Sequence, residues 1–85
     1  MRILVTQEDL NTGERYSAYN SPLSYAFKRA FNSKIAFIGS TICLDKFNVE
    51  LRDIGLEKIT AFDRGEKLEP FEIPISPELI YSRKR

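Results

Sequence analysis

The residues best suited to chemistry lie in one segment, from Gly13 to Arg29. The candidate binding residues of this segment are Arg15, Tyr16, Tyr19, Asn20, Tyr25, Lys28 and Arg29. Aromatic rings and guanidinium groups close to a helix N-terminus can stack on a base and hold a phosphate or another anion. The same residue types are enriched at protein interfaces. A structural role is the alternative, with Tyr16 and Tyr19 covering one end of the core and Lys28 and Arg29 forming a solvated helix face.

The sequence lacks the residue sets that are typical of enzymes and metal sites. It contains no histidine, which excludes the Ser-His-Asp and Cys-His constellations. Its acidic residues are dispersed, mostly in turns or beside basic residues, and no pair is spaced to fix two carboxyls on one helix face beside an apolar wall. The single cysteine, Cys43, lies in an apolar run, where we expect a small buried thiol. Gly39 leads into another strand-like run and lacks the lysine of a phosphate-binding loop. We therefore expect no catalysis, no metal and no cofactor.

Two short elements are expected before an irregular loop at residues 13–20. Residues 3–5 form an apolar run with β-branched members, which predicts a strand. Thr6, followed three residues later by Asp9, resembles a weak capping box and predicts about one turn of helix as far as Leu10.

The segment after this loop carries the strongest helix signal. Ser21 is a favoured N-cap, and Pro22 suits the first helical position, where its missing N–H costs nothing. We expect this helix to end near Asn32. Its apolar stripe at helical spacing is formed by Leu23, Ala26, Phe27, Ala30 and Phe31.

A hairpin is expected next. Residues 35–38 and 41–44 are two β-rich runs, and the Gly39-Ser40 pair between them is typical of a two-residue hairpin turn. Residues 47–49 could add a third strand, but the run is short and its status stays open.

A second helix is predicted from Asp53, as its N-cap, to Gly65, which suits the left-handed position after a helix. The apolar residues expected on its core side are Leu56, Ile59 and Phe62.

The last predicted strand covers residues 68–75. Pro70 and Pro74 remove N–H donors from the same side of this strand, which predicts an edge strand with a blunted outer edge. The resulting expectation is an α+β fold of order β-α-β-β-α-β, with three to five mostly antiparallel strands in a small sheet and two amphipathic helices on one face. Residues 1–76 would form the single domain and residues 77–85 a basic C-terminal tail.

Size and charge narrow the possible functions. The chain has 85 residues and a net charge of +1, from 13 basic and 12 acidic side chains. A domain of this length has a thin core, which argues against a deep substrate pocket. The charge balance argues against nucleic-acid binding by bulk electrostatics. No apolar run approaches the length of a membrane span, so we expect a soluble protein.

Three motifs resemble a group of small uncharacterised proteins encoded by bacteriophages. They are Ile-x-Val-Thr-Gln-Glu-Asp-Leu at residues 3–10, Ser-Pro-Leu-Ser-Tyr-Ala-Phe-Lys-Arg-Ala at residues 21–30, and Phe-Asp-Arg-Gly-Glu-Lys-Leu-Glu-Pro-Phe-Glu-Ile at residues 62–73. In that group the helix commonly opens with Cys-Pro, whereas position 21 is serine here, so no role of that cysteine carries over. The resemblance does not identify any catalytic residue in this chain.

What the resemblance implies is a biological context. Small non-enzymatic phage proteins often act as host-takeover or counter-defence factors in the host cytoplasm. The leading hypothesis is therefore a binding protein that blocks a host protein. The alternatives are an oligomeric sponge that sequesters a signalling nucleotide and a nucleic-acid-binding accessory protein. A blocking function predicts an exposed aromatic or acidic patch, and sequestration predicts ligand sites between subunits of a homo-oligomer.

Overall fold

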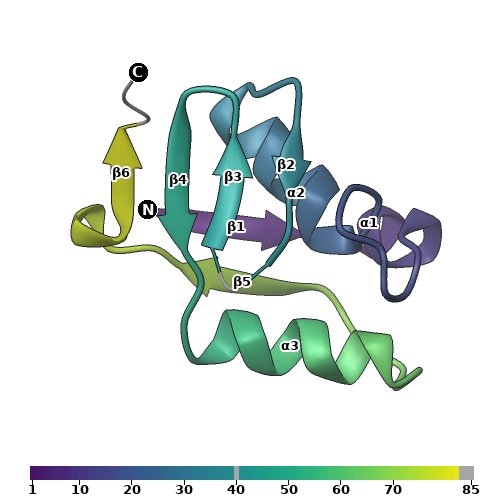
Figure 1. Cartoon of the computed structure of the whole chain (residues 1–85). Coiled ribbons are helices and arrows are strands. Elements are labelled where there is room, and N and C mark those ends of the chain that lie inside the picture. Colours follow the sequence, from purple (N-terminus) through teal and green to yellow (C-terminus); the bar gives the residue numbers. More distant parts are fainter. Residues whose placement is uncertain (40, 83–85) are drawn as a thin grey trace.

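The computed structural model describes residues 1–39 and 41–82 of the chain (Figure 1). In chain order its elements are β1 (Arg2–Val5), α1 (Gln7–Thr12), α2 (Pro22–Phe31), β2 (Ala36–Phe37), β3 (Thr41–Leu44), β4 (Phe47–Glu50), α3 (Ile54–Asp63), β5 (Phe71–Pro74), the 3-10 helix η1 (Pro77–Leu79) and β6 (Ile80–Ser82).

The strands are antiparallel throughout these residues, and the α+β fold class is confirmed. They form two sheets, whereas the sequence had suggested a single one. β1 and β5 make a two-stranded ribbon, and the other strands make a four-stranded sheet in the order β2-β3-β4-β6. The strands of the larger sheet run across the direction of the ribbon in Figure 1.

The ribbon stays two-stranded because both of its outer edges are closed. Ile75 donates its N–H to the Met1 carbonyl at 2.7 Å, so the neighbouring Pro74 has its nitrogen on the side away from β1. That side has no N–H at Pro74 to offer a third strand. On the free side of β1, the Leu4 carbonyl accepts a hydrogen bond from Arg29 at 3.0 Å. β5 is shorter than the strand predicted at residues 68–75 and does not include Pro70, but its outer edge is blocked at Pro74 as expected.

The first hairpin differs from the expected one in its turn. Phe37 pairs with Cys43, one position out of the register that a two-residue turn would impose. Ile38 leaves the strand and donates its N–H to the carbonyl of Ala18 at 2.8 Å. This bond to the irregular loop competes with a tight hairpin turn, so the two-residue turn was wrong. Ser40, which was expected in that turn, lies outside the described residues.

The two-residue turn occurs instead in the second hairpin. Ile42 pairs with Val49, and this register leaves Asp45 and Lys46 as the two residues between β3 and β4. The run at residues 47–49, whose status was open, is therefore a strand of the sheet.

Residues 77–82 are part of the fold, which corrects their assignment to a tail. Ile80 pairs with Val49, and β6 thereby occupies the edge of β4 that β3 leaves free. Leu79 is buried in the core and Ile80 packs against it. A strand of three residues is too short to show a period in the sequence. Residues 83–85 of the expected tail lie outside the described part of the chain.

Helix α2 has the predicted ends. The Ser21 hydroxyl accepts the N–H of Ser24 at 3.2 Å, and Asn32 closes the helix in the left-handed conformation with φ +51°. Ser24 lies off the apolar stripe, yet it is buried. Its hydroxyl donates to the Ala18 carbonyl at 3.0 Å, which ties the irregular loop to the helix.

Helix α3 confirms its predicted end and corrects its predicted start. Gly65 has φ +89°, its N–H donates to the Phe62 carbonyl, and the N–H of Glu66 donates to the Ala61 carbonyl, as in a Schellman motif. Asp53 precedes the helix, but its side chain makes no capping hydrogen bond. Its φ of +48° departs from the extended conformation that an N-cap needs.

Of the three residues expected on the core side of α3, Ile59 and Phe62 are partly buried and pack against the core, whereas Leu56 does not. The buried residues of the helix are Gly55 and Ala61, whereas Leu56 is 41% exposed. A Cβ on Gly55 would collide with the side chain of Leu51, so glycine permits the helix to approach the core closely there. This approach turns Leu56 towards solvent.

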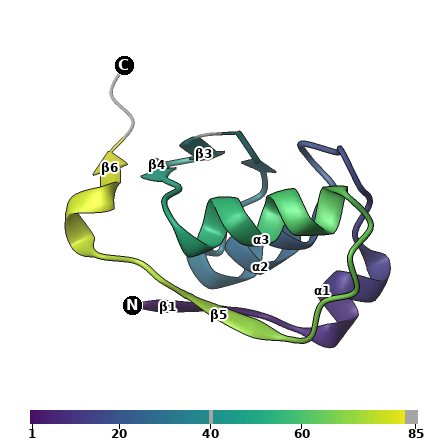
Figure 2. The ribbon, with the colours of Figure 1, turned by 90° about the horizontal axis from the view of Figure 1, so that it is seen from below.

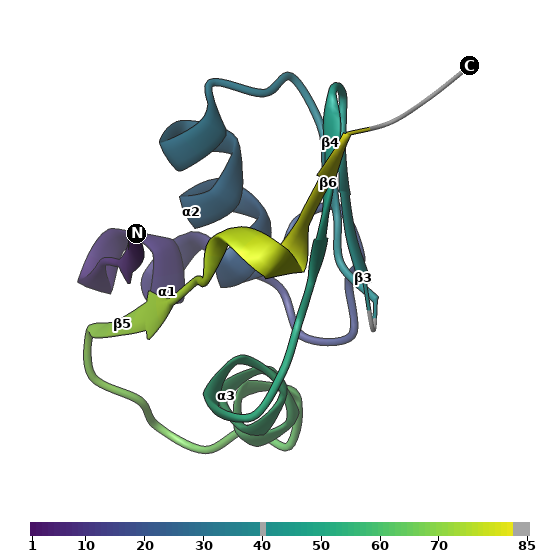
Figure 3. The ribbon, with the colours of Figure 1, turned by 90° about the vertical axis from the view of Figure 1, so that its left-hand side faces the viewer.

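The core lies between the two sheets, with α2 along one side of it and α3 along the opposite side (Figure 3). Phe27 is fully buried there, which contributes about 2–3 kcal/mol relative to an exposed ring. Figure 2 shows α3 passing along the open side between the sheet and the ribbon. The other fully or almost fully buried apolar residues are Ile3, Val5, Leu23, Ala26, Ala36, Ile42, Leu44, Val49 and Ile73.

Candidate functional site

The structure places five of the seven predicted site residues on two surfaces. Tyr25, Lys28 and Arg29 lie on α2 beside α1, whereas Tyr16 and Tyr19 of the loop contact α3 and β2. The two groups differ in what their side chains contact, so we describe them in turn.

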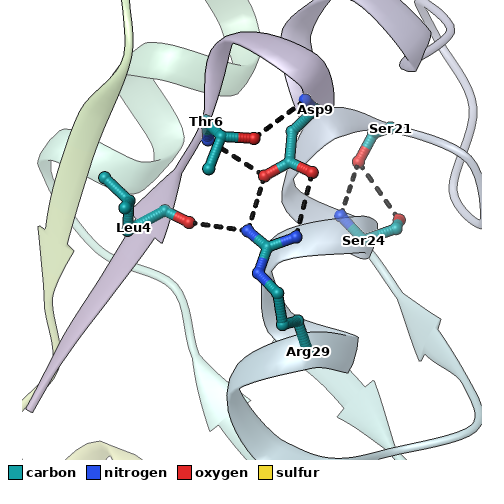
Figure 4. A network of polar contacts seen from close by, with 6 residues as sticks. All are labelled: Leu4, Thr6, Asp9, Ser21, Ser24 and Arg29. Atoms are coloured by element: carbon teal, nitrogen blue, oxygen red, sulfur yellow. Dashed lines mark hydrogen bonds and ion pairs between the residues drawn. The ribbon is translucent and has the colours of Figure 1, made fainter.

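Arg29 is committed to a structural ion pair (Figure 4). Its guanidinium donates to both carboxylate oxygens of Asp9, at 2.8 and 3.2 Å, and to the Leu4 carbonyl. The same carboxylate accepts the N–H of Thr6, while the Thr6 hydroxyl accepts the N–H of Asp9, which confirms the predicted capping box. Arg29 therefore joins β1, α1 and α2, and its positive charge is already neutralised.

The pKa of Asp9 reflects this network. Burial raises the pKa more than any other single effect, because only 4% of the residue is exposed. The hydrogen bonds from Arg29 and Thr6 and the positive charge of Arg29 together outweigh burial, so the pKa lies below the ordinary value of 3.8. The carboxylate is thus ionised at neutral pH, as the ion pair requires.

Tyr25 and Lys28 border a shallow hollow with mixed charge. The Lys28 ammonium lies over the Tyr25 ring, 5.1 Å from its centre, in a cation–π contact. The carboxylates of Glu8 and Asp9 line the same hollow as Lys28 and Arg29. The two charges of each sign balance, so this hollow has little attraction for the phosphate of a nucleotide.

The loop residues contribute to a second hollow, against α3. Tyr16 is 78% exposed and has a positive φ of +57°, which is rare for an aromatic residue. Its N–H donates to the Asp63 carboxylate of α3 at 2.9 Å. The two residues are 47 positions apart in the sequence, and their hydrogen bond stabilises the positive-φ backbone of Tyr16, which leaves its ring at the surface. The hollow has a volume of about 340 Å³, and we call it the aromatic groove; its lining residues are Tyr16, Ser17, Ala18, Ile38, Gly39, Leu56, Ile59 and Asp63.

Tyr19 extends this apolar surface to the edge of the large sheet. Its ring meets Phe37 of β2 edge to face, with the ring centres 5.0 Å apart. Both side chains are exposed. Since Ala18 and Ile38 are joined by a backbone hydrogen bond, the pair lies directly beside the aromatic groove.

Arg15 and Asn20 lie outside the aromatic groove. The Arg15 guanidinium lies over Gly65, where a Cβ would approach it to 2.5 Å. Asn20 shapes the loop through its backbone: its N–H donates to the Ser17 hydroxyl, and its carbonyl accepts the N–H of Glu14.

Tyr16 is the one groove residue among the predicted site residues, and the groove residues that α3 adds, Leu56, Ile59 and Asp63, were not indicated by the sequence. Leu56 had been expected in the core, and Asp63 resembled an ordinary charged helix end. The sequence pattern places an apolar residue of an amphipathic helix in the core. Here Gly55 is the residue that faces the core, and its neighbour Leu56 is therefore exposed. No sequence signal near Asp63 predicts its hydrogen bond with the N–H of Tyr16.

Residues 1–39 and 41–82 contain no group of three or more histidine, cysteine or acidic side chains that could hold a metal ion. Cys43 is half-buried, not fully buried as expected, because it lies on the face of the large sheet that points away from the core. In the same part of the chain, no helix is long and apolar enough to cross a membrane.

Comparison with protein-family models, with curated proteins and with solved structures found no match for this chain.

Proposed function

We propose that this chain is a non-enzymatic binding protein that blocks a host protein by holding an apolar segment of it in the aromatic groove. The observation that carries the proposal is the outward position of Tyr16, which a hydrogen bond to Asp63 maintains against an unfavourable backbone conformation. A ring held at the surface loses little side-chain entropy on binding.

The composition of the groove supports a protein partner. Tyr16, Leu56 and Ile59 present aromatic and aliphatic surface, and the Tyr19–Phe37 pair continues it. Aromatic anchors in a water-excluding apolar surround are typical of the energetic centres of protein interfaces. The resemblance to phage-encoded proteins supports a bacterial protein as the target.

The test is affinity capture from a bacterial lysate followed by measurement with the purified partner. Tyr16→Ala and Leu56→Glu should each weaken binding of the captured protein by about 5- to 30-fold, as expected when an interface anchor is lost. Leu4→Ser is the matched control, because Leu4 is also an exposed apolar residue but lies on the ribbon, and it should bind like the wild type. Equal binding by the wild type and both groove variants would refute the proposal.

Nucleotide sequestration is disfavoured by the balanced charge beside Tyr25 and Lys28. Native mass spectrometry of the purified chain separates the two functions, because a sponge predicts an oligomer with a retained ligand of nucleotide mass. Such a species would count against the blocking function.

A further inference from the structure

Asp63 is the one charged residue among the described residues that line the aromatic groove. It is half-buried, and the other lining residues are aromatic, aliphatic or small and uncharged. One of its carboxylate oxygens accepts the N–H of Tyr16. Within residues 1–39 and 41–82, no other group forms a hydrogen bond or an ion pair with this carboxylate. Its negative charge is therefore not paired with a cation of the described chain.

The basic residues that lie close to Asp63 in the structure or the sequence are engaged elsewhere. Lys58, the one basic residue of α3, has its ammonium over the phenyl ring of β5, 5.1 Å from the ring centre. The Arg64 guanidinium donates to the Glu66 carboxylate at 2.7 and 3.2 Å. Arg15 borders a separate hollow, which Glu66 also lines. The groove thus presents a carboxylate without a basic residue among its described lining.

An apolar path leads along α3 to this carboxylate. Leu56, Ile59 and Asp63 follow one another at spacings of three and four residues, so they lie on one side of the helix. Leu56 is exposed and Ile59 is half-buried. Figure 2 shows α3 at the surface, with no described element in front of it. A long side chain of a partner can therefore lie along this path with its end at Asp63.

We infer that the aromatic groove receives an arginine or lysine from the partner's apolar segment, with the methylene groups on Leu56 and Ile59 and the charged end on the Asp63 carboxylate. Long basic side chains bury their methylene groups against apolar surface while the charged end stays at a polar group. An arginine can also stack on an exposed tyrosine ring such as that of Tyr16. An acidic segment would be repelled. This inference rests on the proposed function, because it names the kind of residue that the same groove would bind.

The first experiment selects ligands from a display library of random peptides. The wild-type chain is immobilised, and peptides that also bind Tyr16→Ala are discarded. We expect the remaining peptides to contain an arginine or lysine flanked by apolar residues. Apolar peptides without a basic residue, or acidic peptides, would overturn this inference and leave the proposed function standing. If no peptide distinguishes the wild type from Tyr16→Ala, both are overturned.

The second experiment measures the pairing with Asp63, using a selected basic peptide and fluorescence anisotropy. Asp63→Asn removes the negative charge, while the amide oxygen can still accept the N–H of Tyr16. Binding should weaken by about 5- to 10-fold, between the effects of losing an exposed and a buried charge pair. Replacing the basic residue of the peptide by glutamine should weaken binding to the wild type by a similar factor and binding to Asp63→Asn very little. Two effects that simply add would overturn the inference.

Two other positions on α3 separate this pairing from net charge and from misfolding. Glu57→Gln makes the same change in net charge, but Glu57 does not line the groove, so binding should stay within about twofold of the wild type. Thr60→Lys places a positive charge three residues before Asp63 and should weaken binding of the basic peptide by about 2- to 5-fold, whereas Thr60→Gln should not. Equal losses for Glu57→Gln and Asp63→Asn would overturn the inference. Circular dichroism of each variant confirms that it is folded.

A second copy of this chain is the other occupant that the experiments must test. Sedimentation velocity of the wild type alone should show a monomer. Self-association that both Leu56→Glu and Asp63→Asn abolish would assign the groove to another copy of the chain and overturn the inference.

Discussion

Arg29→Ala should destabilise the fold strongly, although Arg29 is a half-exposed surface residue. The substitution would leave the Asp9 carboxylate, whose side chain is only 5% exposed, with the Thr6 N–H as its remaining partner in this network. Breaking a fully buried pair costs about 3–5 kcal/mol, and an exposed pair contributes about 0–1 kcal/mol. Arg29 itself is 53% exposed, so we expect an intermediate loss of about 2–3 kcal/mol. For a domain of this size the melting temperature should fall by roughly 10–20 °C.

The pH dependence of this loss has a definite sign. In the wild type the folded-state pKa of Asp9 lies below 3.8, so the stability from its ionised form is present above pH 3.8 and is lost as the pH falls through the folded-state pKa. Without Arg29 this pKa should rise, because the hydrogen bond and the positive charge of Arg29 no longer offset burial. Acidification from pH 7 should therefore narrow the stability difference between wild type and variant, because protonation relieves the unpaired carboxylate. Urea denaturation of both proteins from pH 3 to pH 7 measures this difference in the free energy of unfolding.

Two further variants make this reasoning refutable. Arg52→Ala breaks the exposed pair with Glu50 and should leave the melting temperature nearly unchanged. Asp9→Asn/Arg29→Ala should be no less stable than Arg29→Ala, because the amide needs no counter-ion. A small melting-temperature change for Arg29→Ala would show that the ion pair does not support the fold. The same conclusion would follow if the double variant lost as much stability as the Asp9→Asn and Arg29→Ala single variants added together.

Three other predictions concern local structure and are checked by thermal denaturation. Gly65→Ala should cost about 1–2 kcal/mol, because φ is +89° there, whereas Gly39→Ala has room for its Cβ and should be nearly neutral; equal effects would contradict the backbone argument. Ser21→Ala should cost about 1 kcal/mol or more, because the N–H of the buried Ser24 loses its acceptor, while the Ser24 hydroxyl keeps its bond to the Ala18 carbonyl; an unchanged melting point would refute the cap. A chain that ends at residue 76 should unfold at a clearly lower temperature, since it loses the strand that pairs with β4, whereas a dispensable tail would leave it unchanged.

Much of the local structure could be predicted from short sequence signals. The N-cap at Ser21, the left-handed Gly65 and the capping box of Thr6 depend on the conformational preferences of one residue and its near neighbours. Pro74 likewise identified an edge strand by lacking an N–H. These features are determined within about one helical turn or one strand, so one sequence is enough to predict them.

The candidate site could be predicted only in part. Tyr16 and Tyr19 were recognised in the loop, but their contacts come from Asp63 and Phe37, which lie far along the chain. Arg29 was expected at a binding surface or on a solvated face, and its ion pair with Asp9, twenty residues earlier, gives it a structural role. Residue type alone does not distinguish an arginine that is free to bind from one that is already paired.

The sequence by itself determined the α+β class, the ends of α2 and α3 apart from the cap at Asp53, and the blocked edge of β5. Only the tertiary structure decided that the strands divide into two sheets, that residues 80–82 complete one of them, and that Leu56 faces solvent. The physical reason is the range of the interactions. Caps and turns depend on local backbone preferences, whereas strand partners and exposed faces depend on which distant segments together bury the apolar core and satisfy the backbone hydrogen bonds.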